Sequence, residues 1–183
     1  MSSIDKKDFM KRVTILIDSR EQKNQHIIAF LDAYGIMHET KKLDYADYSF
    51  SIDGRDFSNS CVVERKANID ELYGNVTHDR ERIEKELDTI SKNTQQCTLL
   101  IENCDNWNEL RDYKVPEEKM ISENRKVDNI GATVHSTLQA WQCGNRYGFH
   151  VDFVKDPKAT ASKILEIFFW YYHNFKLLTA PRK

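Results

Sequence analysis

The stretch CVVERKANIDEL, residues 61–72, constrains the fold of this chain more than any other. An apolar run with the character of a buried β-strand leads directly into Glu64, Arg65 and Lys66, and Asp70 follows. In a strand, Glu64 and Lys66 share one face while Arg65 points to the other, because successive side chains alternate. Charged groups at the end of a central strand are costly to bury unless they bind something. The stretch therefore predicts a sheet with a functional site at the end of one strand.

Length and composition predict one globular domain over residues 1–183, since 40% of the residues are hydrophobic and 31% are charged. We expect the polar residues 1–11 to be flexible. We expect residues 113–126 to form a surface loop, because they are polar, contain a proline and show no period. The net charge of −2 means that any positive surface for nucleic acid must be local.

The sequence also bounds the compartment. The N-terminus lacks the apolar core of a signal peptide, and no apolar run is long enough to span a membrane. The four cysteines form no closely spaced pairs, which favours buried, reduced thiols over a zinc site. These features predict a soluble intracellular protein, cytoplasmic or, in a eukaryote, nuclear.

Apolar runs and turn signals predict an α/β fold in which helices flank a mixed central sheet. The Asp53-Gly54 pair between two strand-like runs predicts a hairpin. Asn68 is a candidate N-cap, and Asp156 before Pro157 predicts the start of the last helix. The expected strands are 12–18, 45–52, 60–66, 97–102 and 148–154, and the expected helices are 25–35, 69–76, 78–92, 106–113, 128–144 and 156–178.

Acidic residues stand at the ends of three of these strands. Asp18 and Glu21 close the first strand, Asp47 lies in the first arm of the hairpin, and Glu64 lies in its second arm. If the three strand ends converge, four carboxylates meet beside a lysine and an arginine. Oxygen-rich acidic clusters suit Mg²⁺ or Mn²⁺, and such an ion can activate water for phosphodiester hydrolysis.

Each of these residues also has an ordinary explanation when it is taken alone. An E-R-K triplet is common on solvated surfaces, Asp18 can cap a helix, and Asp47 can be a turn residue. Their joint position at strand ends favours a site. A carboxylate hairpin followed by E-x-K is the pattern of restriction-endonuclease-like, or PD-(D/E)xK, nucleases.

Three segments in order resemble the nuclease domain of the XPF (ERCC4-type) family of structure-specific endonucleases. They are IDSRE (17–21), LDYADYSF (43–50) and VVERKANIDEL (62–72), which match the family pattern V-D-x-R-E, G-D-Y, E-R-K-x-x-x-D. The resemblance extends over nearly all of the chain from Val13. Two features depart from the family: Ala46 replaces the glycine of G-D, and the tandem helix-hairpin-helix module is missing, which implies a stand-alone nuclease domain.

The resemblance implies a role for each matching residue. Arg65 and Lys66 would handle phosphate or activate water, and Asp70 would be a supporting acid near the metal. The implied ligands of Mg²⁺ or Mn²⁺ are Asp18, Glu21, Asp47 and Glu64. The implied DNA-contacting residues are Arg20, which would orient a phosphate or a neighbouring carboxylate, and Arg80 and Arg82.

These roles predict a divalent-metal-dependent DNA endonuclease that acts on branched, flapped or forked duplex and leaves 5′-phosphate and 3′-hydroxyl ends. The alternative is a DNA-binding or scaffolding subunit that keeps the fold and does not cut. An endonuclease of this kind fits DNA repair, recombination and the processing of viral replication intermediates.

The last helix predicts a homodimer, because its apolar residues cover more than one face and family members pair through their nuclease domains. The alternative is that residues near the N-terminus, or residues 113–126, cover that face within one chain.

Overall fold

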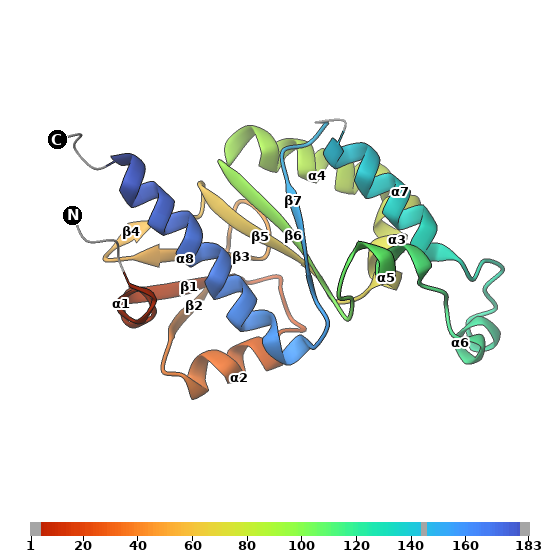
Figure 1. Ribbon diagram of the computed structural model, residues 1–183, viewed down its shortest axis with the longest axis horizontal. Helices are drawn as coiled ribbons and strands as arrows, with labels where there is room; N and C mark the ends of the chain where they lie inside the picture. Colours follow the sequence, from red (N-terminus) through yellow and green to blue (C-terminus); the bar gives the residue numbers. More distant parts are fainter. Residues whose placement is uncertain (1–4, 144–145, 180–183) are drawn as a thin grey trace. The chain divides into compact units, whose positions relative to one another are not determined.

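In the computed structural model, which describes residues 5–143 and 146–179, the chain divides into two compact units. The first contains the residues up to Val63 and those from Lys158 onward, and the second contains Glu64–Pro157. Strand β5 (Cys61–Lys66) continues from one unit into the other (Figure 1).

The sheet of the first unit has the order β2-β1-β3-β5. Strand β1 pairs in parallel with β2 and antiparallel with β3, and the helix α2 connects β1 to β2. The bounds in this unit are α1 Lys6–Arg12, β1 Val13–Asp18, α2 Gln25–Ala33, β2 Met37–Lys41, β3 Tyr48–Ile52, β4 Arg55–Asp56 and α8 Thr160–Thr179. Strand β2 was not expected, because MHETK is a largely exposed edge strand without apolar alternation.

The hairpin turn at Asp53-Gly54 is confirmed, since both residues have positive φ, 53° and 77°. The returning arm is, however, the short strand β4, which pairs with β3 at Ser51 and Ile52. The run expected as the returning arm is β5, and it pairs with β3 where Tyr48 faces Val63. The segment predicted as the second arm of the hairpin, residues 60–66, is therefore the strand that follows that arm.

Aromatic side chains form the core between the sheet and the helices of the first unit. Phe50 of β3 stacks on Phe168 of α8 with ring centroids 4.9 Å apart, and Phe9 of α1 packs on Phe169 at 5.6 Å. Residues 6–11, expected to belong to a flexible segment, are therefore part of a helix that Asp5 caps and Phe9 anchors. The last helix is preceded by a 3₁₀ turn, Pro157–Ala159, so α8 begins at Thr160 rather than near Asp156.

In the second unit the strand order is β5-β6-β7, and β6 and β7 are parallel. Helix α4 buries Ile83, Leu87 and Ile90, which recur at helical spacing, and Asn68 caps α3 as predicted. No helix among the described residues is long and apolar enough to cross a membrane. The bounds are α3 Ile69–Thr77, α4 Arg80–Asn93, β6 Gln96–Glu102, α5 Trp107–Asp112, α6 Glu117–Ser122, α7 Ile130–Cys143 and β7 His150–Val154.

The segment expected as a surface loop, residues 113–126, contains the short helix α6. In Figure 1, α6 lies at the tip of an excursion that projects from the group formed by α3, α5 and α7. Helix α7 begins at Ile130, two residues after the predicted start; its predicted end at Gly144 lies outside the described residues.

Gly131 allows α7 to approach the end of α5 closely. A Cβ atom at this position would lie 2.1 Å from the Leu110 carbonyl oxygen and 2.8 Å from that of Tyr113. Both neighbours are backbone atoms, so they cannot move aside as a flexible side chain would.

We predict that Gly131→Ala lowers the free energy of unfolding by about 1–3 kcal/mol, because the added methyl group forces the backbone of the two helices apart. Urea denaturation measures this change. Gly74→Ala is the matched control, since Gly74 is also helical and a Cβ there meets no atom within 4 Å. The control should be neutral or more stable by up to about 1 kcal/mol. Equal stability of Gly131→Ala and the unsubstituted chain would contradict the packing described.

Candidate active site

Asp18 ends β1 as a buried and fully hydrogen-bonded carboxylate, with 1% of its surface exposed. One oxygen accepts hydrogen bonds from the backbone N–H and Nε of Arg20, both at 2.7 Å. The other accepts from Arg20 Nη2 at 3.0 Å and from the Leu43 backbone N–H at 2.8 Å. Burial disfavours the ionised form, but these bonds outweigh it, so the pKa of Asp18 is lowered. Asp18 is therefore an ionised carboxylate that fixes the turn after β1.

Backbone hydrogen bonds align Asp18 with the other strand ends. The Asp18 N–H donates to the Asp47 carbonyl at 2.8 Å, and the Asp47 N–H donates to the Val63 carbonyl at 3.1 Å. Glu64 is the next residue of β5. The main chains of Asp18, Asp47 and Val63 are thus linked in order within the first unit.

Ala46, which stands where the family pattern has glycine, has φ of 55°. This is the left-handed region, which costs an alanine roughly 1–2 kcal/mol relative to its right-handed conformation. The strain explains the preference for glycine before the motif aspartate. Here Ala46 adopts this conformation directly before Asp47.

Glu21 lies in the turn after β1, half-buried, and its backbone N–H donates to the Asp18 carbonyl at 3.0 Å. Arg20 donates to the Asp18 carboxylate and to the Leu43 carbonyl, at 3.2 Å. Of the two roles considered for Arg20, the structure shows contact with the neighbouring carboxylate.

Glu64 and Lys66 form a buried ion pair within β5, with Nζ 2.7 Å from the carboxylate. The i, i+2 spacing puts both side chains on one face, as predicted. Burial raises the pKa of Glu64, and the nearby carboxylates of Glu86 and Glu71 raise it further, against the attraction of Lys66. An additional positive charge nearby would therefore stabilise the ionised form of Glu64.

Arg65 is committed to a different partner. Its Nη1 lies 2.7 Å from the Glu102 carboxylate, and both side chains are less than 5% exposed. Glu102 ends the neighbouring strand β6. The resemblance implied a phosphate-handling role for Arg65, whereas the contact present here is a buried carboxylate.

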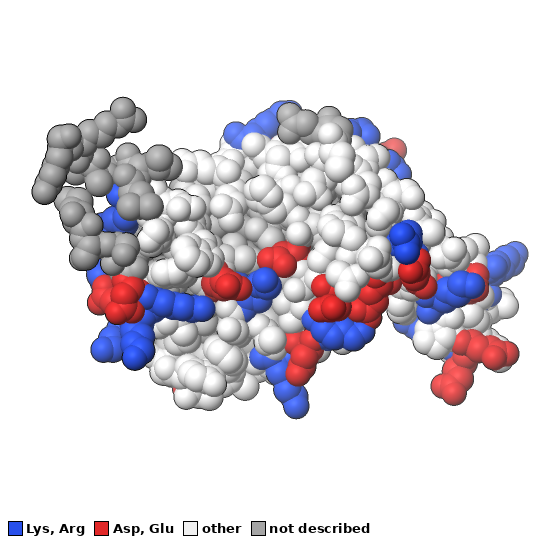
Figure 2. All heavy atoms as spheres, in the orientation of Figure 1, with Lys and Arg blue, Asp and Glu red and all other residues white. Residues whose placement is uncertain are grey.

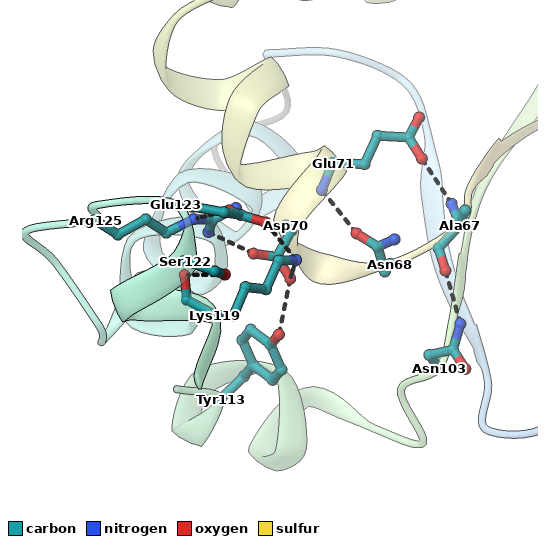
Figure 3. Close-up of polar contacts among 10 residues, drawn as sticks. All are labelled: Ala67, Asn68, Asp70, Glu71, Asn103, Tyr113, Lys119, Ser122, Glu123 and Arg125. Atoms are coloured by element: carbon teal, nitrogen blue, oxygen red, sulfur yellow. Dashed lines mark hydrogen bonds and ion pairs between the residues drawn. The ribbon is translucent and has the colours of Figure 1, made fainter. Parts of the chain in front are cut away.

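Asp70 anchors the excursion of residues 113–126 to α3 (Figure 3). Its carboxylate accepts a hydrogen bond from the Tyr113 hydroxyl at 2.8 Å and from Arg125 at 2.5 Å, and Lys119 lies 3.1 Å away. Burial opposes ionisation, but Tyr113, Lys119 and Arg125 outweigh it and lower the pKa of Asp70. The partners of this motif aspartate thus come from a segment far along the chain.

Arg80 and Arg82, the two candidate DNA contacts on α4, are exposed. Arg80 pairs with Glu84 at 2.9 Å and lies over the ring of Trp141, 5.5 Å from its centroid. Arg82 pairs with Glu86 at 3.4 Å. Figure 2 shows acidic and basic side chains interspersed on the face that it displays, which agrees with the net charge of −2.

Within residues 5–143 and 146–179, no group of three or more histidine, cysteine, aspartate or glutamate side chains is arranged to hold a metal ion. Asp18, Glu21 and Asp47 belong to the first unit and Glu64 begins the second. The four-carboxylate metal cluster stays a prediction. Its donor types still fit a hard divalent cation, because buried Glu64 has a raised pKa that a cation would offset.

Several residues at the site were not singled out from the sequence. Glu102 carried a signal, because it is an acid that ends a continuous apolar run, like Asp18. The partners of Asp70, which are Tyr113, Lys119 and Arg125, carried none, since they lie in a segment without a period.

We predict that Arg65→Met lowers the free energy of unfolding by about 3–5 kcal/mol, because it leaves the Glu102 carboxylate buried without its partner. Glu102→Leu should have a similar effect. The double variant should recover most of the loss, since two apolar groups replace the ion pair. Urea denaturation of all four proteins measures the coupling, and additive losses in the double variant would argue against a buried pair.

We predict that Asp70→Asn lowers the free energy of unfolding by about 1–3 kcal/mol at neutral pH and speeds amide exchange in residues 113–126. The folded-state pKa of Asp70 lies below 3.8, so its contribution is present above that pH and is lost as pH falls through the folded-state value. The difference between variant and unsubstituted chain should therefore shrink in acid. Hydrogen exchange and urea denaturation, each at neutral and at acidic pH, test this prediction.

Glu123→Gln is the matched control, because Glu123 pairs with the same Arg125 and Lys119 but is 43% exposed. It should change stability by less than about 1 kcal/mol. Unchanged exchange of residues 113–126 in Asp70→Asn would rule out the anchoring role.

Comparison with known proteins agrees with this architecture. The ERCC4 domain matches residues 17–167, a range that includes most of both units. No curated protein sequence matches the chain. XPF from Aeropyrum pernix is similar in structure, with a TM-score of 0.57 and 18% identity, over 91% of this chain and 62% of that chain.

The structure of XPF from Aeropyrum pernix in complex with DNA gives a TM-score of 0.58 and 18% identity, over 93% of this chain and 75% of that one. This chain therefore spans less than two thirds of the first of these structures. The mixed sheet flanked by helices is the restriction-endonuclease-like fold expected from the sequence. With the domain matched over most of its length, the chain belongs to the ERCC4 domain family.

Proposed function

We propose that this chain is a divalent-metal-dependent DNA endonuclease that hydrolyses phosphodiester bonds in branched, flapped or forked duplex. The observation that carries the proposal is the backbone register in which Asp18, Asp47 and Val63 are linked in order, so that three motif segments end side by side. Membership of the ERCC4 domain family supports it, since the motif residues occur in this chain in the family's order.

The proposed ligands of Mg²⁺ or Mn²⁺ are Asp18, Glu21, Asp47 and Glu64. When bound, such an ion supplies a lowered pKa for a coordinated water and positive charge beside the phosphate. The assignment of metal ligands depends mainly on Asp47 and Glu64, because the Asp18 carboxylate already accepts hydrogen bonds from four N–H groups. The Asp18 main chain positions Asp47 in either case.

The cationic residues of the motif have complementary tasks in this proposal. Lys66, held 2.7 Å from Glu64, would exchange a proton with the attacking water or stabilise charge on the phosphate. Arg65 braces β5 through Glu102 and keeps Glu64 and Lys66 on their face of the strand. In-line attack of water on phosphorus then leaves a 5′-phosphate and a 3′-hydroxyl.

DNA is the proposed partner, and the structural similarity to XPF from Aeropyrum pernix in complex with DNA supports this choice. Arg80 and Arg82 are exposed and can exchange their helix partners Glu84 and Glu86 for phosphate groups. Contacts of this kind are independent of sequence and weaken with salt. Arg20 would act on DNA only by leaving Asp18.

We also propose a homodimer that uses α8. Much of the apolar surface of this helix is covered within the first unit, since Phe168 and Phe169 are buried against Phe50 and Phe9. Phe9, near the N-terminus, therefore covers part of α8 within one chain, as the alternative to a dimer predicted. Trp170, which is 52% exposed, is the part of α8 that supports a second copy.

A second candidate function is a subunit that binds DNA without cutting it. One specific observation favours it: Asp18 and Glu64 are each neutralised by a cation of the chain itself, Arg20 and Lys66. In an enzyme, both pairs must rearrange or share their carboxylates with the metal. Metal-dependent cleavage of flap, fork and nicked DNA separates the two functions.

We predict that Asp47→Ala and Glu64→Ala each abolish cleavage of flap or fork DNA in the presence of Mg²⁺ or Mn²⁺, because each removes a proposed ligand. Circular dichroism and thermal unfolding establish that the variants are folded. Glu81→Ala is the control, since this exposed glutamate of α4 lies outside the motif, and it should cleave normally. Cleavage retained by a folded Asp47→Ala or Glu64→Ala protein refutes the assignment.

A further inference from the structure

We propose that a cavity beside α3 binds one unpaired nucleotide of a DNA strand, an inference that rests on the proposed function and adds a part of the substrate to it. The cavity has a volume of about 360 Å³. It lies entirely within the second unit, between α3 and the chain that returns from the excursion to α7. Its walls include Asp70, Tyr73, His78, Arg125, Lys126 and Ile130.

The cavity offers aromatic and apolar surface for a base. The rings of Tyr73 and His78 lie 6.4 Å apart with an interplanar angle of 83°. Because the two planes are nearly perpendicular, a flat base can stack on one ring while the other meets its edge. Val127, which also lines the cavity and is 50% exposed, supplies apolar contact. Aromatic stacking of this kind accepts any base.

Among the described residues that line the cavity, one cation has no charged partner. Asp70 contacts Lys119 and Arg125, and Glu123 pairs with the same two residues, so these four charges balance. Lys126, which is exposed, makes no hydrogen bond or ion pair with any of the described residues. An ammonium group beside an aromatic wall matches a phosphate attached to a base.

The position of the cavity along the chain connects it to the motif. Helix α3 begins three residues after Lys66, and its first turn contains Asp70. Asp70 also fixes the excursion whose returning chain forms the opposite wall (Figure 3). The motif aspartate therefore shapes the cavity and acts as a positioning residue.

The volume sets the size of the occupant. Binding pockets for small molecules span about 300–1,000 Å³, so a cavity of about 360 Å³ has the size for one nucleotide. A base can stack on Tyr73 only if it has left its own partner. The occupant is thus an unpaired position of a strand, as found at a flap or fork.

Binding of the full chain to two DNA probes in EDTA tests the inference without cleavage. The probes are a blunt duplex and the same duplex with an unpaired strand that carries 2-aminopurine. We expect the second probe to bind about tenfold more tightly, with quenched 2-aminopurine fluorescence. Lys126→Ala and Tyr73→Leu should each remove most of this preference, and Tyr73→Phe should retain the quenching. Lys92→Ala, which removes the same charge outside the cavity, should bind like the unsubstituted chain.

The inference is overturned if Lys126→Ala and Tyr73→Leu keep the full preference and the quenching. It is also overturned if deoxyadenosine monophosphate competes as strongly as the unpaired strand, because the cavity would then be a site for free nucleotides. The proposed function is tested separately by cleavage in Mg²⁺. Cleavage by the unsubstituted chain without any preference for the unpaired strand would remove this inference and leave the nuclease assignment intact.

Discussion

The burial of three consecutive charged residues at the end of β5 is the constraint on which the candidate site depends. Glu64, Arg65 and Lys66 are all buried, and a buried charge without a partner costs several kcal/mol. Because side chains alternate along the strand, the two ion pairs lie on opposite faces. Lys66 neutralises Glu64 on one face, and Arg65 pairs with Glu102 on the other. The Arg65–Glu102 pair joins β5 to β6, and the Glu64–Lys66 pair joins the two residues that we propose for the reaction.

Other residues of the motif, before and after β5, also have structural roles. Ala46 accepts a left-handed conformation so that Asp47 can connect β1 to β5 by backbone hydrogen bonds. Asp70, two residues into α3, holds a segment more than forty residues away through Tyr113 and Arg125. Residues that read as a compact motif in the sequence therefore divide their work. Some align strand ends, and one fixes an excursion that forms the wall of a cavity.

Much of this could be predicted from the sequence, for local reasons. Strand β1, the Asp53-Gly54 turn and the stripe of Ile83 on α4 follow from apolar periodicity and turn chemistry. Strand β2 could not be found, because an exposed edge strand such as Met37–Lys41 has no apolar alternation. The partners of Asp70 were out of reach as well. Tertiary contacts over such separations leave no trace in a local pattern. The resemblance implied that Arg65 handles phosphate or activates water and that Asp70 supports the metal site.

We propose Asp47 and Glu64 as ligands of a divalent cation, and Mn²⁺ binding tests this proposal most directly. Titration of the unsubstituted chain with Mn²⁺, followed by loss of the free-ion electron paramagnetic resonance signal, should show binding. The double variant Asp47→Asn, Glu64→Gln should leave the signal of free Mn²⁺ unchanged while remaining folded. Equal Mn²⁺ binding by the two proteins, or no binding by the unsubstituted chain, would contradict the account.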